Sequence, residues 1–180
     1  MKNVKSLFLL GTVMAVMSTS ALADTVGTQT FKANIFANTC VIANLQQKVD
    51  LGDVQKAPYT KVEAWNVPST SPVVKAHFDV TGCGNSITKV KVTPHYSSTS
   101  ITRMIVNSGT AKEVYFDTGK LSNTDYDPKR EWKSGSAKEF TLTNGAVQIP
   151  VDGTLTVGDY PDKVAVGTLD FQMTFTFDFV

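Results

Sequence analysis

The chain has 180 residues, of which 42% are hydrophobic and 18% charged, with a formal net charge of +1 at pH 7. This length suits a single domain with a buried core. The near-neutral charge offers no basic field for nucleic acid or an anionic membrane, so both classes of partner are excluded.

The first 23 residues have the pattern of a secretory signal peptide. Lys2 and Lys5 give a positive start, residues 7–17 are apolar, and the small-x-small run Ala21-Leu22-Ala23 precedes Asp24. The apolar run is shorter than the about 20 residues that a membrane-spanning helix needs. We therefore expect cleavage after residue 23 and export. Losing two lysines turns the balance of 17 basic against 16 acidic residues slightly negative.

The two cysteines of the chain are Cys40 and Cys83. An even pair in an exported protein predicts a disulfide, because the periplasm and the exterior are oxidising. Closing a loop of about forty residues should contribute roughly 3–4 kcal/mol to stability in the chain-entropy model.

The middle of the chain consists of short apolar runs separated by Gly, Pro and Asn. We interpret the runs at residues 31–36, 41–42, 49–52, 77–80, 89–92, 104–106, 114–116, 140–142 and 147–151 as strands. Asn144-Gly145 is typical of a hairpin turn between the last two. Residues 24–30 are polar and look like an extension rather than a core element. Since no window has the period of an amphipathic helix, the pattern predicts a one-domain antiparallel sandwich.

The end of the chain reads as one long strand. Its apolar residues fall on odd positions: Leu169, Phe171, Met173, Phe175, Phe177 and Phe179. Thr, Asp and Gln occupy the even positions, so one face is apolar and the other polar. Burying each large apolar side chain contributes roughly 1.5–3 kcal/mol, so this face must be covered. An inner strand of an ordinary sandwich is the plainest interpretation.

No pattern of catalytic or metal-binding residues stands out. His77 and His95 lack the close ligand spacing of a zinc site, and we expect both on strand surfaces. Residues 125–128 and 152–162 contain Asp beside Gly or Pro, which is ordinary turn chemistry rather than a calcium loop. No G-x-S-x-G elbow or phosphate-binding glycine loop occurs. We expect neither an enzyme nor a cofactor.

Four aromatic residues could line a sugar-binding platform: Trp65, Trp132, Tyr126 and Tyr160. Packing under long loops is the commoner role of such residues, and we favour it here.

Taken together, the landmarks of the mature chain resemble a known family. They are the signal peptide, the short extension, Phe31-Lys32-Ala33, Cys40, Leu51-Gly52, Gly82-Cys83, Ile149-Pro150-Val151, Gly167 and the next-to-last aromatic Phe179. This order resembles the pilin subunits of chaperone–usher fimbriae of the type 1 kind. Phe179 stands where the family most often has Tyr, and residues 158–162 also look like spore-coat-U-type pilins.

The resemblance implies an all-β fold: an incomplete immunoglobulin-like antiparallel sandwich that lacks its final strand and carries one disulfide. The acceptor groove, which also binds the chaperone, would comprise Gly167, Leu169, Phe171, Met173, Phe175, Phe177 and Phe179. A periplasmic chaperone would lend a strand to this groove during folding, an outer-membrane usher would export the subunit, and a neighbouring subunit would replace the chaperone's strand.

The implied donor is the N-terminal extension, which divides the chain into a signal peptide (1–23), a donor strand (24–35) and a pilin domain (36–180). Gly27, Gln29, Phe31 and Ala33 would be the inward set, because that parity contains the large apolar Phe31. The opposite parity, Val26-Thr28-Thr30, stays open.

Head-to-tail donation does not close on itself and so builds a filament, here a fimbria on the bacterial surface that supports adhesion. The space before Cys40 is too short for a separate lectin domain, which favours a shaft or adaptor subunit. The alternative is a self-contained secreted sandwich that binds a glycan or receptor. Such a domain would be a stable monomer, whereas a pilin without its chaperone would be unstable or polymerise.

Overall fold

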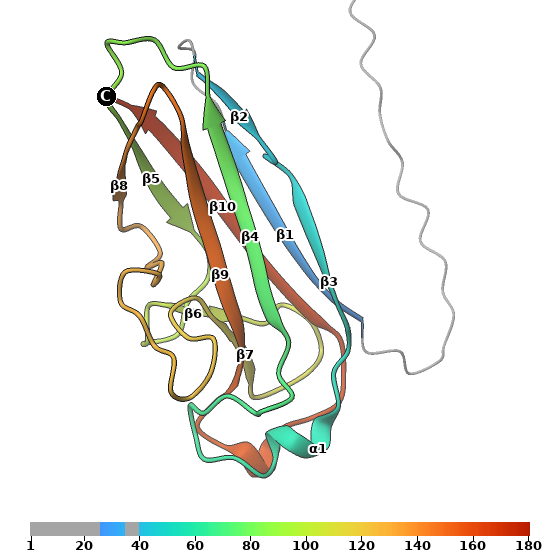
Figure 1. Ribbon diagram of the computed structural model, residues 1–180. Coiled ribbons are helices and arrows are strands. Elements are labelled where there is room, and N and C mark those ends of the chain that lie inside the picture. Colours follow the sequence, from blue (N-terminus) through green and yellow to red (C-terminus); the bar gives the residue numbers. More distant parts are fainter. Residues whose placement is uncertain (1–25, 35–39) are drawn as a thin grey trace, which may run out of the picture.

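A computed structural model describes residues 26–34 and 40–180 as two five-stranded sheets packed face to face (Figure 1). In these residues the helical segments are the short turns α1 (Lys56–Tyr59) and η1 (Pro161–Lys163). The predicted signal peptide lies outside the described residues. The predicted all-β sandwich is confirmed.

One sheet, which we call sheet A, contains both ends of the described chain. Its strands in spatial order are β3 (Gln47–Asp53), β1 (Val26–Asn34), β10 (Leu169–Phe179), β5 (Lys89–His95) and β8 (Lys138–Thr141). Neighbouring strands run antiparallel except β1 and β10, which run parallel. The segment that the sequence presents as an extension therefore lies inside a sheet (Figure 1).

The opposite sheet, sheet B, is antiparallel throughout. Its strands in spatial order are β2 (Val41–Ala43), β4 (Val73–Thr81), β9 (Val147–Val157), β7 (Val114–Asp117) and β6 (Met104–Val106). Each apolar run singled out in the sequence lies in or overlaps a strand of sheet A or B, because alternating side chains can be half-buried only on a pleated surface.

The apolar face of β10 packs on sheet B. The ring of Phe175 makes edge-to-face contacts with Phe78 of β4 and with Trp132, at centroid distances of 5.0 and 5.4 Å. Phe171 contacts Phe116 of β7 at 5.9 Å. Edge-to-face pairs suit the charge distribution of aromatic rings and add to the hydrophobic gain of burial. The face that the sequence requires to be covered is thus covered by the chain's own second sheet.

The polar segment between β7 and β8 is anchored at both ends. Asp117 is fully buried and accepts hydrogen bonds from Arg103 Nε, at 3.0 and 3.1 Å, and from the Gly119 N–H at 2.8 Å. Trp132 is 1% exposed, and its backbone N–H donates to Thr118 Oγ1 at 3.0 Å. A buried carboxylate is tolerated only when it is paired in this way, so these contacts hold the segment on the sandwich.

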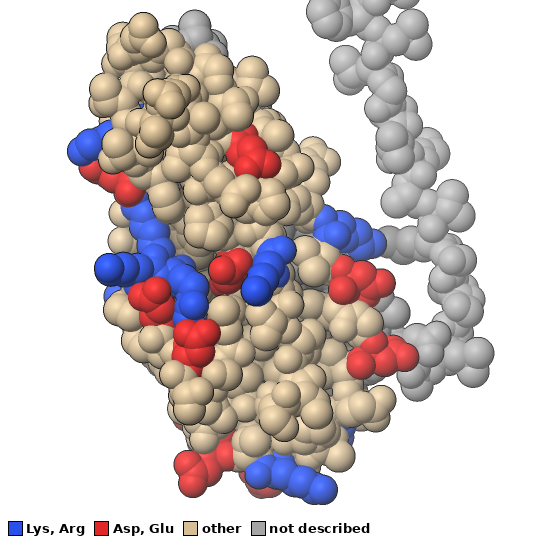
Figure 2. Space-filling view, viewed as in Figure 1, with Lys and Arg blue, Asp and Glu red and all other residues tan. Residues whose placement is uncertain are grey.

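Charged side chains are interspersed rather than gathered by sign on the face shown in Figure 2. Ion pairs join Lys89 to Glu139 and Arg130 to Asp125. Surface pairs of this kind contribute little to stability.

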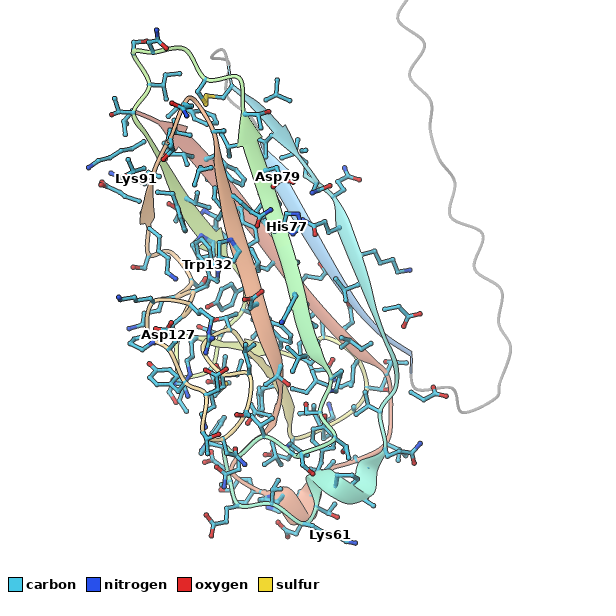
Figure 3. All side chains as sticks on the ribbon, viewed as in Figure 1. Lys61, His77, Asp79, Lys91, Asp127 and Trp132 are labelled. Atoms are coloured by element: carbon cyan, nitrogen blue, oxygen red, sulfur yellow. A yellow bond between two sulfur atoms is a disulfide. The ribbon has the colours of Figure 1, made fainter. Side chains whose placement is uncertain are left out.

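The predicted disulfide joins Cys40, which precedes β2, to Cys83, which follows β4 (Figure 3). The Asn144-Gly145 turn lies against it, since the Cys83 N–H donates to the Gly145 carbonyl at 3.1 Å. A Cβ at Gly145 would lie 2.6 Å from the Cys83 carbonyl oxygen, and the φ of Gly145 is +70°. Both features require glycine at this position.

The same turn corrects one sequence prediction. Thr143 and Ala146 exchange the two hydrogen bonds of a tight turn, as expected. However, β8 pairs with β5 in sheet A, whereas β9 pairs with β4 and β7 in sheet B. The turn therefore connects the two sheets and not two adjacent strands. The physical reason is length: β9 pairs with β4 along residues 147–154, a longer ladder than the four-residue β8 can offer.

Replacing both Cys40 and Cys83 by serine should lower the free energy of unfolding of the mature chain by roughly 3–4 kcal/mol, because the unfolded chain regains the freedom of the closed loop. Urea denaturation measures the difference. Val41→Thr, a change at a neighbouring side chain that is 62% exposed, is the control. A double variant no less stable than this control would contradict the prediction.

Candidate functional site

The space between β10 and β3 holds the strand β1. β1 runs parallel to β10, in a register that extends from Gly27–Leu169 to Asn34–Thr176. On its other side β1 pairs antiparallel with β3 over residues 26–31. We call this strand-wide space, bounded by β3 and β10, the slot (Figure 1).

The body of the sandwich depends on the strand in the slot. Within sheet A, β3 has β1 as its only neighbouring strand among the described residues. With the slot empty, β3 and β10 would each direct a row of unpaired N–H and C=O groups into it. Unpaired backbone groups are costly when buried, and they form a template for strand addition when exposed. β1, the strand that fills the slot, precedes every other described strand in the sequence.

The register places the two predicted residue sets opposite each other. The candidate donor residues Gly27, Gln29, Phe31 and Ala33 are the partners of Leu169, Phe171, Met173 and Phe175, in that order. Directly paired residues of adjacent strands share a face of the sheet. Which of these donor side chains point inward stays a prediction. The part these residues play in assembly stays a prediction.

The candidate acceptor residues differ in position. Those of odd number from 169 to 177 are buried, whereas Phe179 is partly buried at the end of the strand. Gly167 precedes β10, and a Cβ there would lie 2.4 Å from the Ala111 backbone nitrogen. Glycine at 167 is thus required by the close approach of another loop.

A pocket of about 540 Å³ opens where β10 begins. Its walls come from residues 54–56 after β3, from Tyr59, from residues 110, 111 and 114, and from residues 164–169. By register this is also the N-terminal end of β1. No sequence pattern pointed to this pocket, because its walls come from three stretches that lie far apart in the chain, residues 54–59, 110–114 and 164–169. The pocket continues the slot beyond the first register pair, Gly27 and Leu169, and most of its lining is apolar.

Tyr59 closes the floor of this pocket. It is 1% exposed, and its hydroxyl lies 3.0 Å from Ser71 Oγ, which itself donates to the Leu155 carbonyl at 2.9 Å. Burial raises the pKa of Tyr59 to about 12, although the hydrogen bond with Ser71 partly opposes the rise. This chain of hydrogen bonds fixes the α1 segment to β9.

The other residues singled out in the sequence do not form one site. His77 lies on β4 with its Nε2 3.3 Å from Asp79 Oδ2 (Figure 3), whereas His95 lies on β5 in the other sheet, next to Thr176. Among the residues described, no group of three or more His, Cys, Asp and Glu could hold a metal ion. The helices of this part of the chain are also too short to cross a membrane.

The four candidate aromatics also differ in burial and in the residues that they contact. Trp132 belongs to the core, as the packing interpretation predicts. Tyr126 and Tyr160 are about half exposed, at 46% and 51%. The indole N–H of Trp65 donates to Asp159 Oδ1 at 2.8 Å. Trp132 therefore cannot be part of an exposed sugar platform.

Replacing Tyr59 by phenylalanine should remove one source of alkaline instability. Because its pKa is raised in the folded chain, folding keeps the phenol protonated after the unfolded chain has begun to ionise. Stability from this source is intact below about pH 10 and is lost as the pH rises towards 12. The free energy of unfolding of Tyr59→Phe should thus fall less steeply than that of the wild type above about pH 10. Urea titrations with the exposed-site variant Tyr160→Phe as control test this, and equal slopes would contradict it.

Comparison with known proteins places this fold. The structure is similar to the crystal structure of the P pilus rod subunit PapA, with a TM-score of 0.55 and 13% sequence identity, over 79% of this chain and the whole of that one. No protein-family model and no curated protein sequence matches the chain. The chain therefore has the fold of a pilus subunit, an immunoglobulin-like sandwich with one disulfide.

Proposed function

We propose that the chain is a structural subunit of a bacterial surface fimbria, which polymerises by donating its N-terminal strand to the slot of the next subunit. One observation carries the proposal: the slot between β3 and β10 is filled by residues 26–34, the N-terminal segment that precedes Cys40 and all other strands in the sequence. The fold shared with a pilus rod subunit supports it.

Strand exchange needs no new kind of contact. The ladder that β1 forms with β3 and β10 inside one chain can be formed equally by the same segment of a second chain, as in domain swapping. Backbone hydrogen bonds supply affinity, and alternate side chains fix the register. Since donor and acceptor are different surfaces, the contact repeats head to tail and gives an open filament.

Self-insertion competes with exchange. A strand joined to its own domain by a short connection has an effective concentration on the order of millimolar, which exceeds that of free neighbours. Below about millimolar chain concentration, assembly therefore requires that the slot be held by another strand until a neighbour arrives. In the proposal, a periplasmic chaperone holds it and an outer-membrane usher exchanges the chaperone for the next subunit. The fimbria then supports adhesion at the cell surface.

The second candidate function is a self-contained secreted binding domain. It is favoured by the same strand, because β1 already completes the sheet of its own chain. In this case β1 would stay in place permanently, and the protein would act as a monomer.

Refolding the mature chain, residues 24–180, from urea at rising concentration separates the two functions. We expect monomers in dilute solution and head-to-tail oligomers as the chain concentration approaches about millimolar. An excess of a synthetic peptide of residues 24–35 should cap the oligomers as monomers that carry one peptide. Light scattering and native mass spectrometry measure both. Monomers at every concentration, without bound peptide, would establish the self-contained domain.

Two glutamate substitutions test the parity of the donor. Phe31→Glu should prevent oligomers, because a buried unpaired carboxylate costs several kcal/mol. Thr30→Glu changes the neighbouring position and should oligomerise as the wild type does. The same concentrated refolding is the measurement. The reverse result would assign the inward set to Val26, Thr28 and Thr30.

A further inference from the structure

The first half of β10 lacks a strand on the side away from the slot. β5 pairs with β10 only along residues 174–179 of β10. Next to residues 168–170, the place of a strand is taken by residues 107–111 of the connection between β6 and β7, which we call the 107–111 loop. Backbone groups need a partner on both edges of an inner strand, so this loop must supply them.

The backbone of the loop provides part of these partners. The Ser108 N–H donates to the Asp170 carbonyl at 2.8 Å, and the Ala111 N–H donates to the Thr168 carbonyl at 3.1 Å. In the opposite direction, the Thr168 N–H donates to Thr110 Oγ1 at 2.8 Å. Residues 168 and 170 thus direct their polar groups at the loop, away from the slot.

Asn107 joins the loop to the strand with all four hydrogen-bonding positions of its amide. Its Oδ1 accepts from the Asp170 N–H at 2.7 Å and from the Gly109 N–H at 3.0 Å. Its Nδ2 donates to the Thr168 carbonyl at 3.2 Å and to the Ala111 carbonyl at 2.9 Å. Only a primary amide has two donors and an acceptor of this geometry on one short side chain.

Gly109 allows the loop to lie this close. A Cβ on residue 109 would be 2.1 Å from the Thr168 carbonyl oxygen. The loop is also one wall of the pocket at the end of the slot, through residues 110 and 111.

The consequence for the slot follows from strand geometry. Successive residues of a strand direct their N–H and C=O groups to opposite edges. Because residues 168 and 170 are bonded to the loop, residues 169 and 171 direct theirs into the slot, where they lie opposite Gly27 and Gln29 in the register of β1. The loop thus holds the first half of β10 in an extended conformation. The edge of β10 that faces this half of the slot is therefore ready to pair with a strand.

We propose that Asn107 is a positioning residue for strand addition: through the 107–111 loop it holds the first half of β10 ready for the strand that enters the slot. The assignment rests on the proposed function for its role in assembly. Its structural part concerns β1 in its own slot and can be tested without assembly.

Hydrogen exchange of the full mature chain, resolved by residue, tests the structural part. In Asn107→Ala we expect faster exchange, on the order of ten-fold, at residues 169–173 and 27–31, where the ladder depends on the loop. Residues 174–178, which β5 supports, and the strands β4 and β9 should keep their wild-type rates. Thr110→Val, which removes the acceptor for the Thr168 N–H and the hydrogen bond between the Thr110 and Thr168 hydroxyls but leaves the Asn107 amide in place, should give the same pattern with smaller changes.

Asn123→Ala is the matched control. Asn123 also holds a loop through both groups of its amide, with Oδ1 2.6 Å from the Val67 nitrogen and Nδ2 3.0 Å from the Val67 carbonyl oxygen, but these bonds join it to Val67 and not to β10. Exchange that rises equally along all strands in Asn107→Ala, or in the same places in Asn123→Ala, would overturn the proposal.

Concentrated refolding adds the functional readout. Asn107→Ala should form several-fold less oligomer than Asn123→Ala when the wild type oligomerises, and equal yields would overturn the role in assembly. If the wild type stays monomeric, the fimbrial function fails, while the exchange pattern still decides whether Asn107 positions β10.

Discussion

The structure depends on how the edge of β10 that faces the slot is paired. β10 is an inner strand of sheet A, and two parts of it need partners of different kinds: its apolar side chains must be covered, and its two backbone edges must be hydrogen-bonded. The side chains are covered by sheet B of the same chain, through rings such as Phe78 and Phe116. The edges need hydrogen-bond partners. One edge has β5 and the 107–111 loop, and the other has only what lies in the slot. A hydrophobic face can be satisfied by any close-packed neighbour, whereas a backbone edge needs donors and acceptors aligned with its own, from a strand in register or from a loop such as 107–111.

This division is compatible both with a closed monomer and with the polymer that we propose. The packing of the two sheets through residues such as Phe78, Phe116 and Phe175 is intramolecular in either state. The ladder in the slot is the part that can be exchanged, since a segment of identical sequence fits whichever chain it comes from. The parallel direction of β1 follows the path of the chain, whose next described residue after β1 is Cys40, near the end of β4.

The sequence predicted most of the fold because its signals are local. The odd-even alternation of residues 169–179 fixed the inward face of β10, and the even cysteine pair in an exported chain predicted the disulfide that the structure contains. The Asn144-Gly145 dipeptide predicted the turn, but pairing is decided by ladder length over distant residues, so the partners of β8 and β9 could not be inferred. Within β1 only the run from residue 31 reads as a strand; residues 26–30 are too polar to predict one, and only the family resemblance implied a strand there. The pocket at the start of β10 and the role of Asn107 left no pattern, because each depends on tertiary contacts between segments more than fifty residues apart.

The position of the disulfide has a mechanical consequence. Only residues 35–39 separate β1 from Cys40, which is bonded to Cys83 at the end of β4. The strand after Cys40, β2, is held to β4 by a ladder of only three residues, 41–43. Tension applied to β1 from outside the domain would reach the end of β4 in sheet B through a covalent bond and would bypass this weak ladder. The domain would therefore resist being peeled open from its N-terminal side, and the strand in the slot would yield before the sandwich did.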